Sequence, residues 1–82
     1  MKEEEILDVV RRALKRIAPE ANLDTLKGDE DVREALDIDS MDFNNFVVSL
    51  HETLKVDIAE KDYPKLFTLN GCVKELGART AR

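Results

Sequence analysis

The residues best placed to do chemistry are Asp39-Ser40-Met41, where an amphipathic helix is expected to begin after a long loop. Ser40 is one of only two serines, and its position would hold a hydroxyl in the first helical turn, facing solvent. Its sequence neighbours are carboxylates rather than a histidine, so it lacks the base that activates a serine nucleophile. The pattern favours a hydroxyl that another enzyme modifies.

A serine that opens a helix most often serves only as a cap for the first backbone N–H groups. Here Asp39 can cap the helix instead, which would leave the Ser40 hydroxyl free. A helix N-terminus also favours phosphate, although the carboxylates of Asp39 and Asp42 would oppose it. The local electrostatics therefore suggest modification without establishing it.

Other candidates for chemistry are weaker. An EF-hand starting at Asp37 fails, because its sixth residue is Asp42 rather than Gly and its twelfth is Val48 rather than Glu. A single cysteine and a single histidine argue against a zinc site. Cys72 lies on an apolar stripe and reads as a core residue, and His51 reads as a surface residue. We expect no metal site and no enzymatic activity.

Composition limits the class of protein further. The chain has 82 residues, enough for one small domain, and its aromatic content of 5% without Trp favours helices over a β-sandwich. A net charge of −5 opposes binding to nucleic acid. No apolar run is long enough to span a membrane, and the N-terminus lacks a signal-peptide pattern. We expect a cytoplasmic monomer.

Apolar periodicity predicts a first helix over residues 2–17, ended by Pro19. Its acidic first turn and basic last turn both complement the helix dipole. The connection over residues 18–39 is too long to be structureless in so small a domain. We expect it to pack back onto the core, with a tight turn at Gly28 and a helical turn near residues 31–35.

The best-specified helix runs from Ser40 to about Leu54, and a short third helix over residues 59–63 is expected to end at Pro64. Thr68 would cap a last helix that stops at Gly77. The sequence therefore predicts an all-α fold, a four-helix bundle with a long first loop and a short third helix. One domain would fill residues 1–82, with an ordered core over about 3–77 and a frayed tail over 78–82.

The second helix has more apolar residues than its core stripe requires. Met41 and Val48 fall almost opposite that stripe, and Asn45 and Glu52 share the outward face. Two exposed apolar side chains among polar ones form a small docking patch, although scattered exposed apolar residues are also ordinary. The position of the pair, running down from Ser40, favours docking.

With its preceding Leu36-Asp37-Ile38, the Asp39-Ser40-Met41 motif resembles the prosthetic-group attachment motif of the acyl carrier protein family. That motif is usually Asp-Ser-Leu preceded by Leu-Gly. The resemblance extends over roughly residues 6–76, including the long first loop and the short third helix.

The resemblance implies that Ser40 carries 4′-phosphopantetheine, whose terminal thiol holds acyl groups as thioesters. It also implies that a phosphopantetheinyl transferase recognises Asp39 and Met41 beside Ser40. Acyl-transferring or acyl-modifying enzymes would then dock on the second helix, at the residues Met41, Asp42, Asn45, Val48 and Glu52.

Several departures from the family pattern point to a specialised lipid, fatty-acid or polyketide pathway. Asp37 replaces the usual Gly, and Asn44, Asn45 and His51 lie where fatty-acid carriers tend to be acidic. An aminoacyl or peptidyl carrier remains an alternative, as does an unmodified helical interaction module. The basic run Arg11, Arg12, Lys15 and Arg16 reads as a solvated face or, alternatively, as a second contact site.

Overall fold

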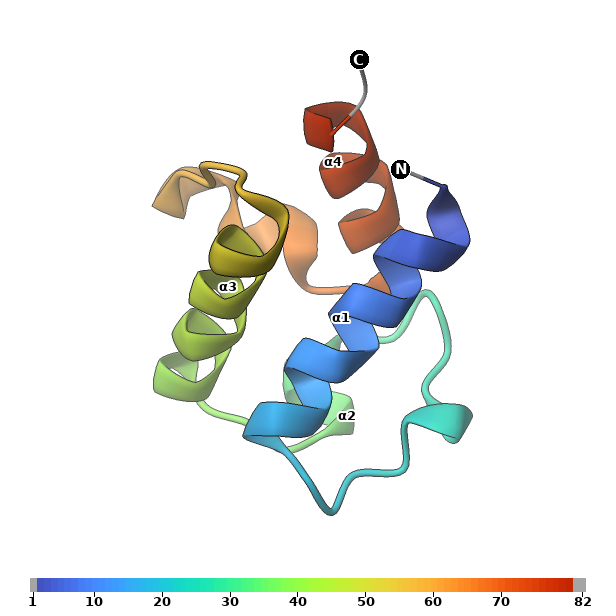
Figure 1. Ribbon diagram of the computed structural model, residues 1–82. Coiled ribbons are helices and arrows are strands. Elements are labelled where there is room, and N and C mark those ends of the chain that lie inside the picture. The colour runs from blue at the N-terminus through green and yellow to red at the C-terminus, as the bar shows by residue number, and fades with distance from the viewer. Residues whose placement is uncertain (1, 81–82) are drawn as a thin grey trace.

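The computed structural model describes residues 2–80, and within that range every regular element is a helix (Figure 1). In chain order these are α1 (Glu3–Ile17), the 3₁₀ helix η1 (Leu23–Thr25), α2 (Val32–Ala35), α3 (Ser40–Leu54), the 3₁₀ helix η2 (Glu60–Leu66) and α4 (Leu69–Thr80). The long helices α1 and α3 fall within one residue of their predicted bounds. The predicted all-α bundle with a long first loop and a short third helix is confirmed.

Helix α1 crosses the molecule between α3 and α4 and contacts both, while η2 packs against α4 (Figure 1). Each long helix turns its apolar stripe inward, because this orientation buries all of the periodically spaced apolar side chains at once. The fully buried side chains are Ile6, Val10, Leu14, Val32, Phe46, Leu50, Leu66, Cys72 and Leu76. They come from every long helix, so one shared core fixes the position of α3.

The long connection packs back onto this core as predicted. Val32 is completely buried, and Leu23, Leu26, Leu36 and Ile38 are half-buried against the core. The predicted turn of helix is α2, and the predicted tight turn lies at Gly28. A Cβ at Gly28 would lie 2.5 Å from the side-chain oxygen of Asn70, so a larger residue at this position would have to displace that side chain of α4.

The prediction that Pro64 ends the third helix is wrong. Helix η2 continues through Pro64 to Leu66, which is completely buried. A 3₁₀ helix accepts the φ angle that proline fixes, and the missing N–H removes only one hydrogen bond. The free energy gained by burying Leu66 outweighs the loss of that one hydrogen bond.

The prediction that Gly77 ends the last helix is also wrong, because α4 extends to Thr80. Gly77 does not adopt the left-handed conformation of a helix stop. The Thr80 hydroxyl donates a hydrogen bond of 2.7 Å to the Leu76 carbonyl. The expected tail is therefore helical over residues 78–80, whereas residues 81 and 82 lie outside the described part of the chain.

Candidate functional site

Ser40 is the first residue of α3, and its side chain is exposed. The preceding residue, Asp39, is extended, and its carboxylate accepts a hydrogen bond of 2.8 Å from the backbone N–H of Asp42. Among residues 2–80 no hydrogen bond involves the Ser40 hydroxyl. Asp39 is therefore the cap, as predicted, and the Ser40 hydroxyl is left free for a reagent arriving from solvent.

The turn before Ser40 has a left-handed residue where the sequence departs from the family pattern. Asp37 has a φ of 53°, a conformation that costs most residues energy and suits Gly, Asn or Asp. Ile38 follows, and its N–H bonds the Arg33 carbonyl at 3.1 Å. Asp37 therefore adopts a turn conformation that a glycine would adopt more readily. With aspartate in place of the family's usual glycine, α3 still begins at Ser40.

Arg33 on α2 is a positioning residue that the sequence analysis did not identify. Its guanidinium binds both carboxylate oxygens of Asp31, at 3.1 and 2.7 Å, and lies 3.5 Å from the centre of the Phe67 ring. The hydrogen bonds from Arg33 lower the pKa of the Asp31 carboxyl. Because the Val32 N–H also bonds the Phe67 carbonyl at 2.8 Å, α2 is tied to the segment before α4. The turn leading to Ser40 therefore starts from a fixed helix.

The outward face of α3 carries four of the five predicted partner-binding residues. Met41 is 73% exposed and Val48 is 43% exposed, and both predictions of exposure are confirmed. Asn45 and Glu52 are exposed between and beyond them, so the four form one stripe at helical spacing. We call these four residues the outer stripe. Asp42 does not join it, because it lies on another flank of α3.

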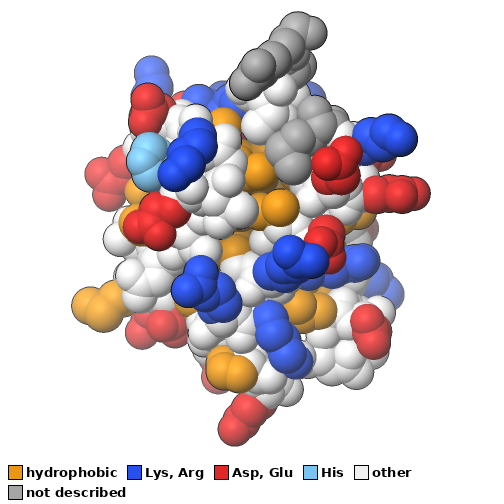
Figure 2. Space-filling model, viewed as in Figure 1, with side chains coloured by type: hydrophobic (Ala, Val, Ile, Leu, Met, Phe, Trp, Pro, Cys, Tyr) orange, Lys and Arg blue, Asp and Glu red, His pale blue; other side chains and the backbone are white. Residues whose placement is uncertain are grey.

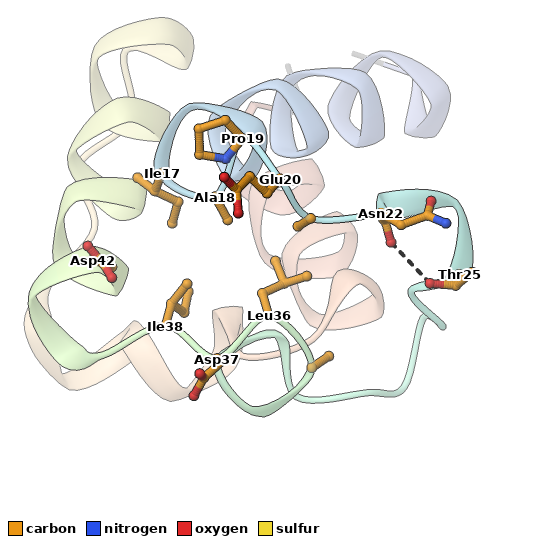
Figure 3. A pocket seen from close by; sticks show the side chains of 12 residues that line it. Ile17, Ala18, Pro19, Glu20, Asn22, Thr25, Leu36, Asp37, Ile38 and Asp42 are labelled. Carbon is orange, nitrogen blue, oxygen red and sulfur yellow. Dashed lines mark hydrogen bonds between the residues drawn. The ribbon is translucent and has the colours of Figure 1, made fainter.

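Asp42 lines a cavity of about 560 Å³ between the end of α1, the first loop and the turn before α3 (Figure 3). Ile17 and Ile38 point toward each other across this space from α1 and from the turn (Figure 3). Asp37 and Asp42 therefore line this cavity, and Ser40 does not.

Cys72 and His51 have the roles that the sequence suggested. Cys72 is buried, its Sγ lies 3.3 Å from the Leu66 carbonyl, and burial raises the pKa of its thiol to about 12. His51 is exposed at the end of α3, where its Nδ1 lies 2.6 Å from the Val56 carbonyl. Within the described residues no three His, Cys, Asp or Glu side chains are grouped to hold a metal ion.

Lys and Arg side chains gather over α1 on the face seen in Figure 2. All four residues of the basic run are exposed. Arg12 pairs with Asp8 at 2.9 Å, and the Lys15 ammonium donates to the Ala21 carbonyl at 3.1 Å. Exposed pairs of this kind add little stability, and the basic run lies on a helix that does not carry Ser40.

A family model described as the phosphopantetheine attachment site matches residues 4–79. Comparison with curated proteins and with solved structures gives no match. None of the helices in the described range is both long and apolar enough to cross a membrane. The matched range runs from the first turn of α1 nearly to the end of α4, and Ser40 lies inside it.

Proposed function

We propose that this chain, which belongs to the phosphopantetheine attachment-site family, carries its prosthetic group on Ser40. Family membership implies a covalently attached 4′-phosphopantetheine, and carrier domains of this kind work with a phosphopantetheinyl transferase and with acyl-handling enzymes. When bound, the group supplies a terminal thiol that holds cargo as a thioester. The chain's own contribution is to present one hydroxyl to these enzymes.

The observation that carries the proposal is the exposed Ser40 hydroxyl, left free because Asp39 caps α3. A capping serine would have its oxygen engaged with a backbone N–H, and modification would cost the helix that bond. Here a phosphodiester on Ser40 would cost α3 none of its present hydrogen bonds. The first-turn N–H groups favour the added negative charge, and solvent around Ser40 screens it from the neighbouring carboxylates.

The enzymes that load and use the carrier are proposed to dock beside Ser40. Asp39 and Met41 flank the hydroxyl and would contact the transferase. The outer stripe continues from Met41 to Glu52 on the solvent side of α3, and Asp42 extends the contact toward the first loop. Apolar side chains at the centre of a polar rim are typical of residues that dominate binding energy.

We further propose an acyl cargo, and a pathway more specialised than general fatty-acid synthesis. The exposed side of α3 has Asn44, Asn45 and His51 and only two carboxylates, so it suits partners less basic than those of a strongly acidic carrier. An aminoacyl or peptidyl cargo is the alternative. The carrier itself is not a catalyst in this proposal, and it works as a cytoplasmic monomer shuttling between enzymes.

The attachment is tested by intact-mass spectrometry after incubation with coenzyme A and a phosphopantetheinyl transferase. We expect one added phosphopantetheine on the natural chain and none on Ser40→Ala. The matched control is Ser49→Ala, which removes the only other serine, on the same helix, and should leave loading unchanged. A natural chain that gains no mass, or a Ser40→Ala variant that still gains it, would refute the proposal.

The cargo is tested on carrier purified from its own cells without added substrate. Mass measurement of the thioester, before and after cleavage with hydroxylamine, identifies the attached group. An aliphatic acyl chain supports the proposal, and an amino acid or peptide supports the alternative.

A further inference from the structure

Met41 follows Ser40 directly and is the most exposed large apolar side chain in the described part of the chain. It is 73% exposed, against 43% for Val48, the other apolar member of the outer stripe. In the motif that this chain resembles, leucine usually stands here, so the chain has a thioether in place of a hydrocarbon. The thioether adds one property that leucine lacks, because its sulfur can be oxidised.

The other sulfur atoms of the chain are Cys72 and Met1. Cys72 is buried, and its Sγ lies 3.3 Å from the Leu66 carbonyl. Burial also raises the pKa of the Cys72 thiol, which keeps the readily oxidised thiolate scarce. Met1 lies outside the described residues. Within residues 2–80, Met41 therefore has the one sulfur that is open to an oxidant in solution.

Oxidation of Met41 by a peroxide is a two-electron transfer of one oxygen atom. A lone pair on the thioether sulfur attacks one oxygen of hydrogen peroxide, a sulfur–oxygen bond forms, and the oxygen–oxygen bond breaks. The second oxygen leaves as water, so the sulfur is oxidised and the peroxide is reduced. Hydrogen peroxide carries no charge, so the neighbouring carboxylates of Asp39 and Asp42 do not repel it. The product is methionine sulfoxide, a polar and chiral side chain.

A sulfoxide at this position changes the outer stripe and leaves the core as it is. Met41 is not part of the hydrophobic core, so its oxidation removes no core packing. In a docked complex the same side chain would leave water. A sulfoxide oxygen enclosed there without a hydrogen-bond donor costs binding free energy. Oxidation of Met41 should therefore weaken docking and leave the stability of the carrier nearly unchanged.

We propose that Met41 is a reversible oxidation site through which a peroxide lowers the rate at which Ser40 is loaded. This inference rests on the proposed attachment at Ser40 and on docking at the outer stripe. The thioether presents an apolar contact to the transferase, and the sulfoxide presents a polar one. Methionine sulfoxide reductases, one for each sulfoxide epimer, return the side chain to its apolar form.

The test uses the full chain before loading, treated with hydrogen peroxide and compared with the untreated chain. Intact mass counts the oxygen atoms added, and peptide mapping assigns them to Met41 or to Met1. The rate of loading by a phosphopantetheinyl transferase is then measured at low carrier concentration. We expect kcat/KM to fall roughly tenfold once Met41 is oxidised, with the melting temperature nearly unchanged. Treatment with both reductases should restore the rate.

Met41→Leu is the matched variant, because leucine keeps an apolar side chain of similar size and has no sulfur. The variant retains Met1, so any effect of oxidising that residue is still present. Whatever its own rate of loading, the ratio of its rates before and after peroxide should be close to one. Met41→Gln places a polar side chain there without any oxidant, and it should load about as slowly as the oxidised natural chain.

The inference is overturned if oxidation of Met41 leaves the loading rate unchanged, or if Met41→Leu loses as much rate to peroxide as the natural chain does. It is also overturned if peroxide converts Met1 and spares Met41, or if the melting temperature falls together with the rate, which would place the effect in folding. A natural chain that cannot be loaded before any treatment refutes the proposed function, and this inference with it.

Discussion

The inward and outward faces of α3 belong to one helix and differ in almost every property. Phe43, Phe46, Val47 and Leu50 face inward and are nearly or completely buried. The outer stripe faces solvent, and its two apolar members are the only large apolar side chains exposed in the described part of the chain. The inward face fixes the position of α3 in the fold, and the outward face is the part of the helix that is open to contact with another protein.

Within this one helix, the residues that stabilise the fold and the residues that we propose bind partners lie on opposite faces. Ser40 is not part of the hydrophobic core, and the buried residues of α3 hold it in position. Changes on the inward face should therefore act through folding, and changes on the outward face should act through docking. This expectation can be tested by substitution on each face.

The largest effect is expected for Phe46→Ala on the inward face. Phe46 is completely buried, and its ring centre lies 5.5 Å from that of Phe43. Truncating a buried aromatic residue typically costs about 3–5 kcal/mol, a large share of the stability of a small domain. Urea denaturation followed by circular dichroism measures this loss.

The matched control is the adjacent Asn45→Ala on the outward face. As an exposed substitution without side-chain partners, it should change the free energy of unfolding by less than about 0.5 kcal/mol. If the two neighbours cost the same, the two faces would not differ in the way their burial indicates.

An intermediate effect is expected on the outward face for Met41→Ala together with Val48→Ala. Losing two exposed apolar side chains should leave the melting temperature nearly unchanged. Truncating a residue at the centre of a docking patch often costs about 1 kcal/mol or more, so losing two should slow loading by the transferase roughly thirtyfold in kcat/KM. The measurement is the rate of mass increase at low carrier concentration.

The basic run on α1 is the alternative candidate for the surface that a partner enzyme contacts. If Arg11→Ala with Arg12→Ala slows loading while the pair on α3 does not, the contact surface lies on α1 rather than on the outer stripe. Equal losses from both pairs would mean that the partner spans the two helices.

The smallest effect is expected for Asp37→Gly, in the turn that brings the chain to Ser40. Glycine removes the strain of the left-handed conformation, about 1 kcal/mol or less for aspartate, but loses more entropy on folding. We expect a net gain of roughly 0.5 kcal/mol at most, seen as a small rise in the urea midpoint. Asp37→Val, which is β-branched and suits the turn poorly, should be destabilised instead. A less stable glycine variant would show that the carboxylate contributes more than the strain costs.

The sequence predicted those parts of the fold that depend on neighbouring residues. The periodic stripe of α3, its Asp39 cap and the exposure of Met41 and Val48 all follow from spacings within one helix. The freedom of the Ser40 hydroxyl could be inferred for the same reason, since its competitor for capping is the adjacent residue.

The wrong predictions concern elements whose ends are decided by distant contacts. The Arg79 guanidinium binds the Asp57 carbonyl at 2.7 Å and the Asp62 carboxylate at 2.9 Å, which ties the last turn of α4 to the segment around η2. The ammonium of Lys65 and then the Arg79 guanidinium lower the pKa of Asp62, as expected for a carboxylate paired in this way. No local pattern marks residues 17 to 22 positions apart as partners, so Gly77 and Pro64 looked like stops.

The contacts of Arg33 and Tyr63 could not be predicted from the sequence for the same reason. Arg33 stacks on Phe67, and Tyr63 bonds Asn44, across separations of 34 and 19 residues. In the sequence Arg33 is one charge among many in an acidic loop, and Tyr63 is the residue before a proline. Their roles depend on which helices pack together.

The burial of Cys72 affects whether a carried acyl group can transfer to the chain's own cysteine. Burial raises the thiol pKa of Cys72 to about 12, so the thiolate is rare at pH 7, and the core shields that sulfur. An activated thioester held by the carrier therefore faces no competing sulfur on its own chain and cannot readily migrate onto it. Packing of the core therefore suppresses acylation of Cys72.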